Sequence, residues 1–393
     1  MKTAKNNLGI YVQVPFCQTK CTYCNFHTGV VSAGRFAPYA EAVCREVRQH
    51  PEFYRATGVH LPGEFDKVLV DTVYFGGGTP SLLEPELLQR MMDAIRQTFT
   101  MDLKEVTLEA DPETIEGEKA AAWVAAGINR VSFGLQSFSD KELAAAGRMH
   151  RRADIYRAVP ILRAAGIRNI SFDLIAGLAH QTRESWNESL EELRKLDPQH
   201  VSVYLLEVDE GSRLGKELLA GGLRYSAGAV PSEDEMADFY ETACEFLAAE
   251  GYHHYEISNW AKPGFESRHN LKYWRREAYL GFGAGAHSFS GMERWANAHD
   301  AADYVASVAA GRLPLDQREA VTPSAALEEE LFLGLRQLDG IDVGRIERQY
   351  GVALSPRFGP LESAGLVERH GDMVRLAPAK LSVSNEVFVE LMR

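Results

Sequence analysis

Short β-branched apolar runs alternate with longer amphipathic stretches over the first two thirds of the chain. The apolar runs predict strands at residues 9–14, 70–75, 105–110, 130–134, 169–175 and 201–206. The amphipathic stretches predict helices at residues 39–49, 85–99, 114–126, 153–165 and 183–195. Strand–helix alternation of this kind forms parallel sheets with right-handed crossovers. Six units are too few for a closed eight-unit barrel, so we expect an α/β fold built as an open (β/α)6 partial TIM barrel, with a doubly wound sheet as the alternative.

The pattern changes after the sixth predicted strand. Ser232 has Glu235 three residues later, a capping-box pattern that predicts the start of a helix. A glycine- and aromatic-rich stretch follows, and a further helical segment surrounds residues 300–310. The end of the chain predicts three helices and then a hairpin, at residues 324–338, 343–350, 356–364 and 366–376.

These patterns divide the chain into three expected parts: a barrel over residues 1–250, a connecting segment over 251–312 and a smaller C-terminal domain over 313–393. Three helices and a hairpin resemble a winged helix, which is used either to bind nucleic acid or simply as a packed cap. The formal net charge of −13 disfavours contact with nucleic acid and anionic lipid. We therefore expect a cap on the barrel and no nucleic-acid partner.

The composition also indicates a cellular location. No run of about 18 apolar residues occurs, so no membrane-spanning helix is expected. The first nine residues lack the apolar core of a secretory signal. The chain has five cysteines, three of them within eight residues, which is typical of a metal site in a reducing compartment and not of a disulfide scaffold. We expect a cytoplasmic protein.

Three cysteines, Cys17, Cys21 and Cys24, follow the first predicted strand on one short polar loop. Three thiolates can bind three irons of a [4Fe–4S] cubane and leave the fourth iron free to chelate a small molecule. The alternatives are a chance cluster and a structural zinc site, which usually needs four ligands. His27 is the less favoured candidate for a fourth ligand. The two remaining cysteines, in predicted helices, are expected to be buried small apolar residues.

Polar residues stand at the ends of the next four predicted strands, where a parallel barrel carries its active site. Gly76-Gly77-Gly78-Thr79-Pro80 follows the second strand, and its glycines predict a close ligand approach with free backbone amides. Glu109, Gln136 and Asp173 end the following three strands. Arg148 comes a turn later, where it is either a partner of a carboxylate or an ordinary surface arginine. Together these residues predict a ring of polar groups around one cavity.

The cysteine spacing and the strand-end motifs resemble two nested families. The Cys-x3-Cys-x2-Cys triplet resembles the radical S-adenosylmethionine (SAM) superfamily, which implies a [4Fe–4S] cluster held by Cys17, Cys21 and Cys24, and bound SAM. The strand-end motifs from about residue 8 onwards resemble the oxygen-independent coproporphyrinogen III oxidase (HemN) family over nearly the whole chain. That resemblance implies SAM contacts and assigns no catalytic residue. The contacts are Tyr11, Tyr23, Gly77, Gly78, Thr79, Glu109, Gln136, Arg148 and Asp173.

Two features of the sequence indicate one branch of that family. The oxidase pattern has a fourth cysteine two residues after the third, and here that position is Phe26. The segment His269-Asn-Leu-Lys-Tyr-Trp274 resembles the heme chaperone (HemW) branch, which implies heme as a ligand bound through His269. A structural histidine in an aromatic patch is the alternative. His253, His254 and His287 are lesser heme-ligand candidates.

The resemblance implies a heme chaperone that passes heme to acceptor apoproteins such as respiratory enzymes. It also implies an electron donor of the flavodoxin or ferredoxin type, and it allows transient contact with a membrane where acceptors are membrane-bound. The alternative is a radical SAM enzyme that oxidatively decarboxylates coproporphyrinogen III, an activity that Phe26 places in doubt. Enzymatic turnover is therefore left open.

Overall fold

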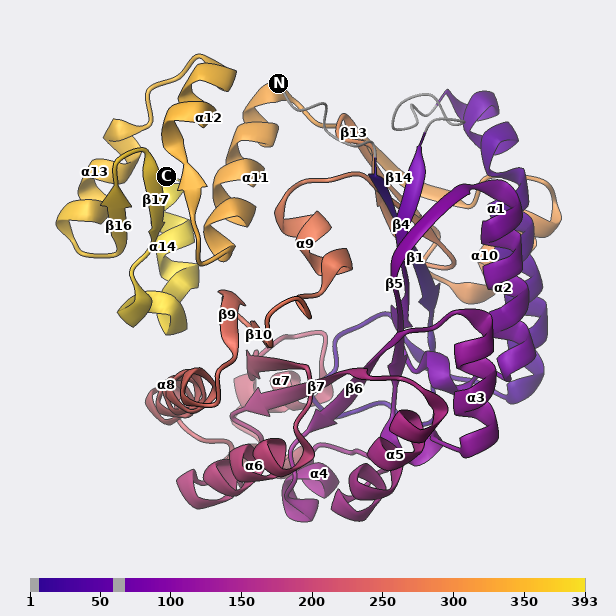
Figure 1. The fold of residues 1–393 in the computed structure, drawn as a ribbon, viewed down its shortest axis with the longest axis horizontal. Coiled ribbons are helices and arrows are strands. Elements are labelled where there is room, and N and C mark those ends of the chain that lie inside the picture. The colour runs from indigo at the N-terminus through magenta and orange to yellow at the C-terminus, as the bar shows by residue number, and fades with distance from the viewer. Residues whose placement is uncertain (1–6, 59–67, 393) are drawn as a thin grey trace.

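The computed structural model describes residues 7–58 and 68–392, and its central feature is a twelve-stranded sheet (Figure 1). Its strand order is β14-β13-β12-β11-β1-β4-β5-β6-β7-β8-β10-β9. These strands are β1 (Asn7–Val14), β4 (Leu69–Gly77), β5 (Thr100–Ala110), β6 (Arg130–Gln136), β7 (Asn169–Ala176), β8 (His200–Leu205), β9 (His253–Glu256), β10 (Asn259–Ala261), β11 (Tyr279–Phe282), β12 (His287–Phe289), β13 (Glu293–Asn297) and β14 (Leu315–Ala320). Two short strands outside the sheet, β2 (Phe16–Cys17) and β3 (Gly29–Val30), pair with each other.

The six predicted strands are β1 and β4 to β8, and they pair in parallel in sequence order. Their apolar residues are almost fully buried, because helices cover one face of the sheet and the barrel interior fills the other. Within the described residues the sheet does not close, since its end strands β9 and β14 each pair only with an inner neighbour. The predicted open partial barrel is therefore confirmed.

Most helices lie on the outer face of the sheet, and the helix at residues 268–274 lies on the opposite face, where His269 contacts Thr72 and Tyr74 of β4 (Figure 1). The helices predicted at residues 85–99, 114–126, 153–165 and 183–195 begin and end within about three residues of those positions, whereas the first helix ends at Thr57, eight residues beyond its predicted end at residue 49. In the barrel they are α1 (Phe36–Thr57), α2 (Pro85–Thr98), α3 (Gly117–Ala126), α4 (Asp140–Ala145), α5 (Arg152–Ala165), α6 (Arg183–Leu196), α7 (Arg213–Leu219), α8 (Glu233–Ala249), α9 (Arg268–Trp274) and α10 (Ala301–Ala309). Gly127 and Gly166 end α3 and α5 in the left-handed conformation that glycine adopts most easily. Ser232 and Glu235 form the predicted capping box of α8.

The C-terminal region carries the predicted three helices and hairpin, gathered on the side of the molecule away from α1 to α3 (Figure 1). Its elements are α11 (Pro323–Arg336), β15 (Ile341–Asp342), α12 (Val343–Tyr350), α13 (Ser355–Ser363), β16 (Val367–His370), β17 (Met373–Leu376) and α14 (Ser384–Leu391). The sequence did not predict α14. An ion pair between Arg336 and Glu256, and an isolated bridge from Glu256 to Gln337, join this region to β9.

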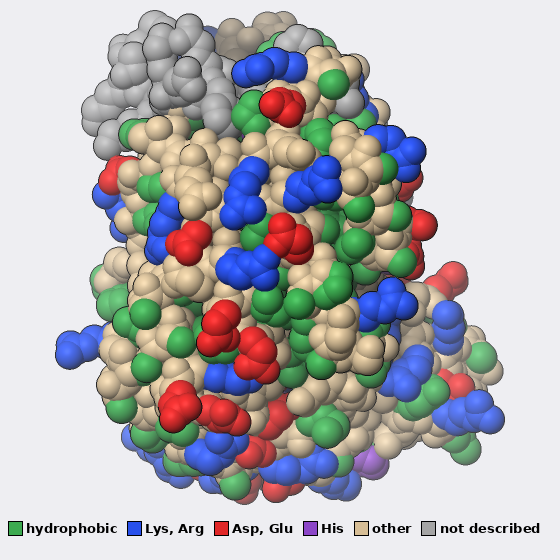
Figure 2. Space-filling view, turned by 90° about the vertical axis from the view of Figure 1, so that its right-hand side faces the viewer, with side chains coloured by type: hydrophobic (Ala, Val, Ile, Leu, Met, Phe, Trp, Pro, Cys, Tyr) green, Lys and Arg blue, Asp and Glu red, His purple; other side chains and the backbone are tan. Residues whose placement is uncertain are grey.

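The surface and the ends of the chain add two observations. On the face over α1, α2 and α3, basic and acidic side chains are interspersed, so this face offers no extended positive surface (Figure 2). Among the helices of the described residues, none combines the length and the apolar character that a bilayer crossing requires. The sequence-based expectation about a secretory signal falls partly on residues 1–6, which lie outside the described residues.

A buried carboxyl group ties α1 to the strands that extend the sheet beyond β1. Glu46 is 1% exposed, and its Oε2 accepts hydrogen bonds from the Gly283 amide at 3.0 Å and the Tyr304 hydroxyl at 2.6 Å. Its Oε1 accepts one from Asn297 Nδ2 at 2.8 Å. Burial raises the pKa of Glu46 to about 7, although these three donors act in the opposite direction.

This raised pKa predicts a pH-dependent stability that Glu46→Gln removes. Between roughly pH 4.5 and 7 the folded protein keeps a proton that the unfolded chain has already released. The stabilising contribution is therefore complete below the unfolded pKa and is lost as pH rises through about 7. From pH 5 to 8 the wild type should lose roughly 2–3 kcal/mol relative to Glu46→Gln, measured as urea unfolding at both pH values. Glu41→Gln, at an exposed position on the same helix, is the control, and parallel profiles for all three proteins would contradict the prediction.

Candidate functional site

One cavity of about 590 Å³ opens at the carboxyl ends of the parallel strands. The three clustered cysteines and eight of the nine expected SAM contacts line it together. They are Cys17, Cys21, Cys24, Tyr23, Gly77, Gly78, Thr79, Glu109, Gln136, Arg148 and Asp173. Residues that are up to 156 positions apart (17 to 173) therefore meet at one site, as the strand-end argument predicted.

The cysteine loop is held between two short helices that the sequence did not predict. The Thr22 amide donates to the Ala146 carbonyl at the end of α4 at 3.0 Å, and the Leu214 amide at the start of α7 donates to the Thr22 carbonyl at 2.8 Å. Asn25 Nδ2 donates to Asp209 Oδ2 at 2.9 Å. These bonds fix the backbone between the thiols, so the loop is preorganised for its ligand.

The donor set fits a cubane cluster. All three thiols are free and partly buried, and all three face the same cavity. Within the described residues, no three cysteine, histidine or carboxylate side chains converge as ligands of one metal ion. A cubane does not need such convergence, because each thiolate binds a different iron. Burial raises the pKa of the Cys17 and Cys24 thiols, a shift that a bound cationic centre reverses.

The glycine turn after β4 approaches the cysteine loop closely, but its amides are not free. The Gly77 amide donates to Glu109 Oε2 at 2.9 Å, and the Gly78 amide donates to the Val14 carbonyl at 2.9 Å. The Thr79 amide donates to the Phe16 carbonyl at 2.7 Å. The prediction of free backbone amides was therefore wrong for these three residues, and the glycines serve a close strand–loop contact at the cavity wall.

Glu109 is a buried carboxyl group on the cavity wall. Its Oε1 accepts a hydrogen bond from the Tyr74 hydroxyl at 2.8 Å, in addition to the Gly77 bond. Burial raises its pKa to about 7, with Asp173 and Asp111 adding repulsion and the two hydrogen bonds acting the other way. A carboxyl group of this kind accepts or shares protons with a bound hydroxyl or ammonium group near neutral pH.

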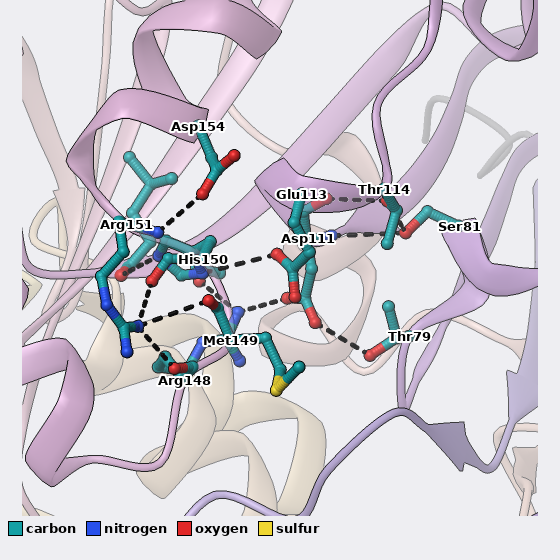
Figure 3. Close-up of polar contacts among 12 residues, drawn as sticks. Thr79, Ser81, Asp111, Glu113, Thr114, Arg148, Met149, His150, Arg151 and Asp154 are labelled. Atoms are coloured by element: carbon teal, nitrogen blue, oxygen red, sulfur yellow. Dashed lines mark hydrogen bonds and ion pairs between the residues drawn. The ribbon is translucent and has the colours of Figure 1, made fainter.

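Of the two alternatives for Arg148, the structure shows the carboxylate pair, and the partner is Asp111 (Figure 3). The same guanidinium donates to the Gly134 carbonyl at 2.6 Å and lies 3.5 Å from Cys21 Sγ. Asp111 also accepts a hydrogen bond from Thr79 Oγ1 at 3.1 Å. Arg148 therefore connects the ends of β5 and β6 to the cysteine loop.

The two remaining polar side chains complete the wall. Gln136 ends β6 with φ of 69°, a left-handed conformation that a non-glycine residue rarely adopts. A strained backbone conformation persists only where the surrounding structure holds it in place. Gln136 adopts this conformation at the cavity wall. Burial raises the pKa of Asp173, whose carboxylate accepts a weak hydrogen bond from Ser132 Oγ at 3.3 Å. Both side chains are available to polar groups of a ligand.

Two sequence-predicted residues lie outside this cavity wall. Tyr11 stacks on Tyr74 with ring centroids 5.9 Å apart and donates its hydroxyl to Gln13 Oε1 at 2.7 Å. His269, in α9, is 1% exposed. Its Nδ1 lies 2.9 Å from Thr72 Oγ1, and its Nε2 lies 2.9 Å from the Tyr273 hydroxyl.

This environment does not fit an axial heme ligand in the conformation described. Both ring nitrogens of His269 are already engaged in hydrogen bonds. Burial lowers its pKa to about 3 and so keeps the ring neutral, which is the form that binds metals, and the obstacle to ligation is the two hydrogen bonds. The amide groups of Arg268 and His269 also donate to the buried Glu105 carboxylate, which fixes the start of α9 on β5. Ligation of iron through this ring requires one of its two hydrogen bonds, to Thr72 or to Tyr273, to break. The assignment of His269 to heme stays a prediction.

The C-terminal region contributes part of the cavity wall, which the sequence did not predict. Arg336 and the segment around α14 line the cavity from the far end of the chain, through Leu381, Ser382, Ser384 and Asn385. Small polar residues in a terminal segment carry no sequence signal for a cavity. Only the packing of the C-terminal region beside the barrel places them there.

Known proteins share the sequence and the fold of this chain. Residues 11–193 match the radical SAM superfamily, and residues 321–379 match the HemN C-terminal domain. The chain is 34% identical to the heme chaperone HemW of Bacillus subtilis over 96% of this chain and 97% of that protein. It is 33% identical to HemW of Escherichia coli over 71% and 69% of the two chains. The solved structure of coproporphyrinogen III oxidase (HemN) from Escherichia coli, described as a radical SAM enzyme, superposes with a TM-score of 0.82 over 98% of this chain and 89% of that chain, at 23% identity, and so shows a common fold.

Proposed function

The chain belongs to the HemW family of the radical SAM superfamily, and from this premise we propose that it binds heme and delivers it to acceptor apoproteins such as respiratory enzymes. The superfamily implies a [4Fe–4S] cluster and SAM. The observation that carries the proposal is the similarity to relatives named heme chaperone over nearly the full length of both chains. The cavity geometry supports it, because the expected cofactor residues converge there.

In this proposal Cys17, Cys21 and Cys24 hold the cluster and the surrounding wall holds SAM. The cluster held there would supply one-electron reducing chemistry to bound SAM, with its electron coming from a donor of the flavodoxin or ferredoxin type. The Glu109 and Asp173 carboxylates bind hydroxyl or ammonium groups of the ligand. Arg148 and Asp111 keep the cysteine loop against the strand ends. Tyr23, beside two of the thiols, supplies an aromatic surface to the cavity.

Oxidative decarboxylation of coproporphyrinogen III is the second candidate. Its support is the HemN C-terminal domain and the HemN fold. Against it stands Phe26, a 66% exposed side chain at the cavity where the oxidase pattern has a fourth cysteine. A phenyl ring cannot ligate a metal.

One experiment separates the two candidates. The anaerobically reconstituted protein is titrated with heme and, separately, incubated with SAM, dithionite and coproporphyrinogen III. We expect a Soret shift that saturates with heme, and no protoporphyrinogen. 5′-Deoxyadenosine in the same samples reports SAM cleavage. Protoporphyrinogen formation would establish the oxidase instead, and a protein that takes up no heme would remove the chaperone proposal.

A further inference from the structure

The cavity wall is rich in carboxylates and carries few cations. Among the described residues, six Asp or Glu side chains line the cavity together with three Lys or Arg side chains, Lys20, Arg148 and Arg336. Arg148 pairs with Asp111 on the same wall. Arg336, the last residue of α11, pairs instead with Glu256, which does not line the cavity. The counter-charge of Arg336 therefore lies outside the cavity wall.

Backbone hydrogen bonds fix the position of Arg336 beside β9. Its carbonyl accepts a hydrogen bond from the Ile257 amide at 3.1 Å. Two residues later, the Leu338 amide donates to the Tyr255 carbonyl at 3.2 Å. The end of α11 is thus joined to the segment of the barrel that contributes Ile257 and Ser258 to the cavity wall. These bonds explain why a side chain from the C-terminal region reaches a cavity of the barrel.

Two contacts hold the guanidinium of Arg336. Its Nη2 lies 3.3 Å from Oε2 of Glu256, a carboxylate that is 0% exposed. The Ser258 amide donates to the other oxygen of Glu256 at 3.0 Å, so this carboxylate is itself fixed. The Cζ of Arg336 lies 4.6 Å from the ring centroid of Trp274, a cation–π contact. Because Trp274 ends both α9 and the His269–Trp274 segment, Arg336 contacts the segment for which the family resemblance implies heme as well as the cavity.

Most hydrogen-bond donors of Arg336 remain unused. A guanidinium has five N–H groups, and among the described residues the bond to Glu256 is the only one that this guanidinium forms. Its Nε is buried without an acceptor. Its Nη1 also has no acceptor in the described part of the chain, but this nitrogen is not buried, and the side chain is 19% exposed. Unused donors on a largely buried cation are costly unless a ligand or water accepts them, so Nη1 and the second hydrogen of Nη2 are available to an oxyanion.

We propose that Arg336 is a carboxylate-binding residue of the cavity, positioned by Glu256 and Trp274. A guanidinium binds a carboxylate through two parallel charge-assisted hydrogen bonds. Two ligands of the proposed function carry this group: a tetrapyrrole carries it in its propionates, and SAM carries it in its methionine part. The inference deepens the proposed function, on which the choice of these two ligands rests.

The charge of the cavity wall explains why a ligand carboxylate needs this cation. The acidic side chains of the wall, Glu109 and Asp173 among them, repel a further negative group, and this repulsion is stronger in a partly buried cavity than in water. A cation that is already fixed in place offsets the repulsion without the cost of ordering a flexible side chain. Neutral and cationic groups gain nothing from Arg336, so the residue favours ligands that carry a carboxylate.

The test compares two pairs of ligands on the full-length, anaerobically reconstituted protein. Heme is compared with heme dimethyl ester, in which both propionates are esterified, and SAM is compared with decarboxylated SAM. Arg336→Gln should weaken the binding of heme or of SAM about tenfold or more, because charge-assisted hydrogen bonds to the carboxylate are lost. The same variant should change the affinity for the matching carboxylate-free ligand by less than about twofold. The pair that responds identifies the bound carboxylate as a propionate or as that of SAM.

Two further variants separate ligand binding from folding. Arg336→Gln alone leaves the Glu256 carboxylate buried without its cation and so lowers the unfolding midpoint. Arg336→Gln combined with Glu256→Gln removes both charges, and it should raise the midpoint again without restoring the ligand affinity. Arg357→Gln is the matched control, because Arg357 pairs with Glu328 in the same C-terminal region and does not line the cavity. It should leave all four affinities at wild-type values.

Three results would overturn the assignment. One is wild-type affinity of Arg336→Gln for both heme and SAM. Another is an equal loss of affinity for a ligand and for its carboxylate-free analogue, which would mean that Arg336 acts only on the fold. The third is recovery of ligand affinity in the double variant, which has no cation at this position. If the wild type itself binds no heme, the proposed function fails, and the SAM pair alone then decides whether Arg336 binds a carboxylate.

Discussion

Cys21→Ala is expected to abolish cluster assembly. Anaerobically reconstituted wild type should carry about four irons per chain, and the variant less than about a tenth of that. The reason is that three thiols are the only cysteines at the cavity among the described residues, and each is needed for a different iron. Cys21 lies at the centre of the loop, 3.5 Å from Arg148 Nη1. Iron and sulfide analysis with visible absorbance measures the loss.

Cys244→Ala is the matched control, because the Cys244 thiol does not line the cavity. Cys244 lies in α8, and burial raises its pKa to about 12, so it stays a neutral thiol at physiological pH. Cys44→Ala, at a fully buried position in α1, is a second control. Both variants should assemble wild-type amounts of iron. Full iron in Cys21→Ala, or zinc in the wild type, would contradict the cluster assignment.

The parallel half of the fold could be predicted because its signal is local. Each strand from β1 to β8 in the main sheet is a compact apolar run that is buried on both faces, and the glycines that end α3 and α5 mark where two of them follow. The edge strands gave no such signal. β10 and β12 have three residues each, and β11 pairs with β1 across about 270 positions of sequence. Pairing at that distance depends on the assembled core.

The residues of the candidate site likewise fall into those that the sequence could place and those that depend on tertiary packing. Residues at the ends of regular strands, such as Glu109 and Asp173, could be placed because the strand positions fix their direction. Arg148 could be expected to meet a carboxylate, but the choice of Asp111 depends on the path of the loop after α4. His269 shows the limit of a motif. The motif indicates that this imidazole is a candidate ligand. Only the packed structure shows that both ring nitrogens already form hydrogen bonds, one with Thr72 and the other with Tyr273.

Gly78→Ala is expected to have the second-largest effect, on both stability and cluster binding. A Cβ at this position would lie 2.5 Å from the Phe16 carbonyl oxygen, 2.8 Å from the Val14 carbonyl oxygen and 2.9 Å from the Phe16 nitrogen. These atoms belong to backbone, so they cannot move aside as a flexible side chain does. The methyl group must push the end of β4 away from the segment that leads directly into Cys17.

The expected cost is roughly 3 kcal/mol or more of unfolding free energy, because overpacking is combined with loss of the bonds from Gly78 to Val14 and from Thr79 to Phe16. Iron content should fall, and the dissociation constant for SAM should rise at least about tenfold. Urea unfolding, iron analysis and equilibrium dialysis with SAM measure the three effects. Gly117→Ala, at the start of α3 with open space around the added methyl, should change stability by less than about 1 kcal/mol. Wild-type iron and stability in Gly78→Ala would mean that the turn can move away from β1 without disturbing the thiols, and that the close contact does not position them.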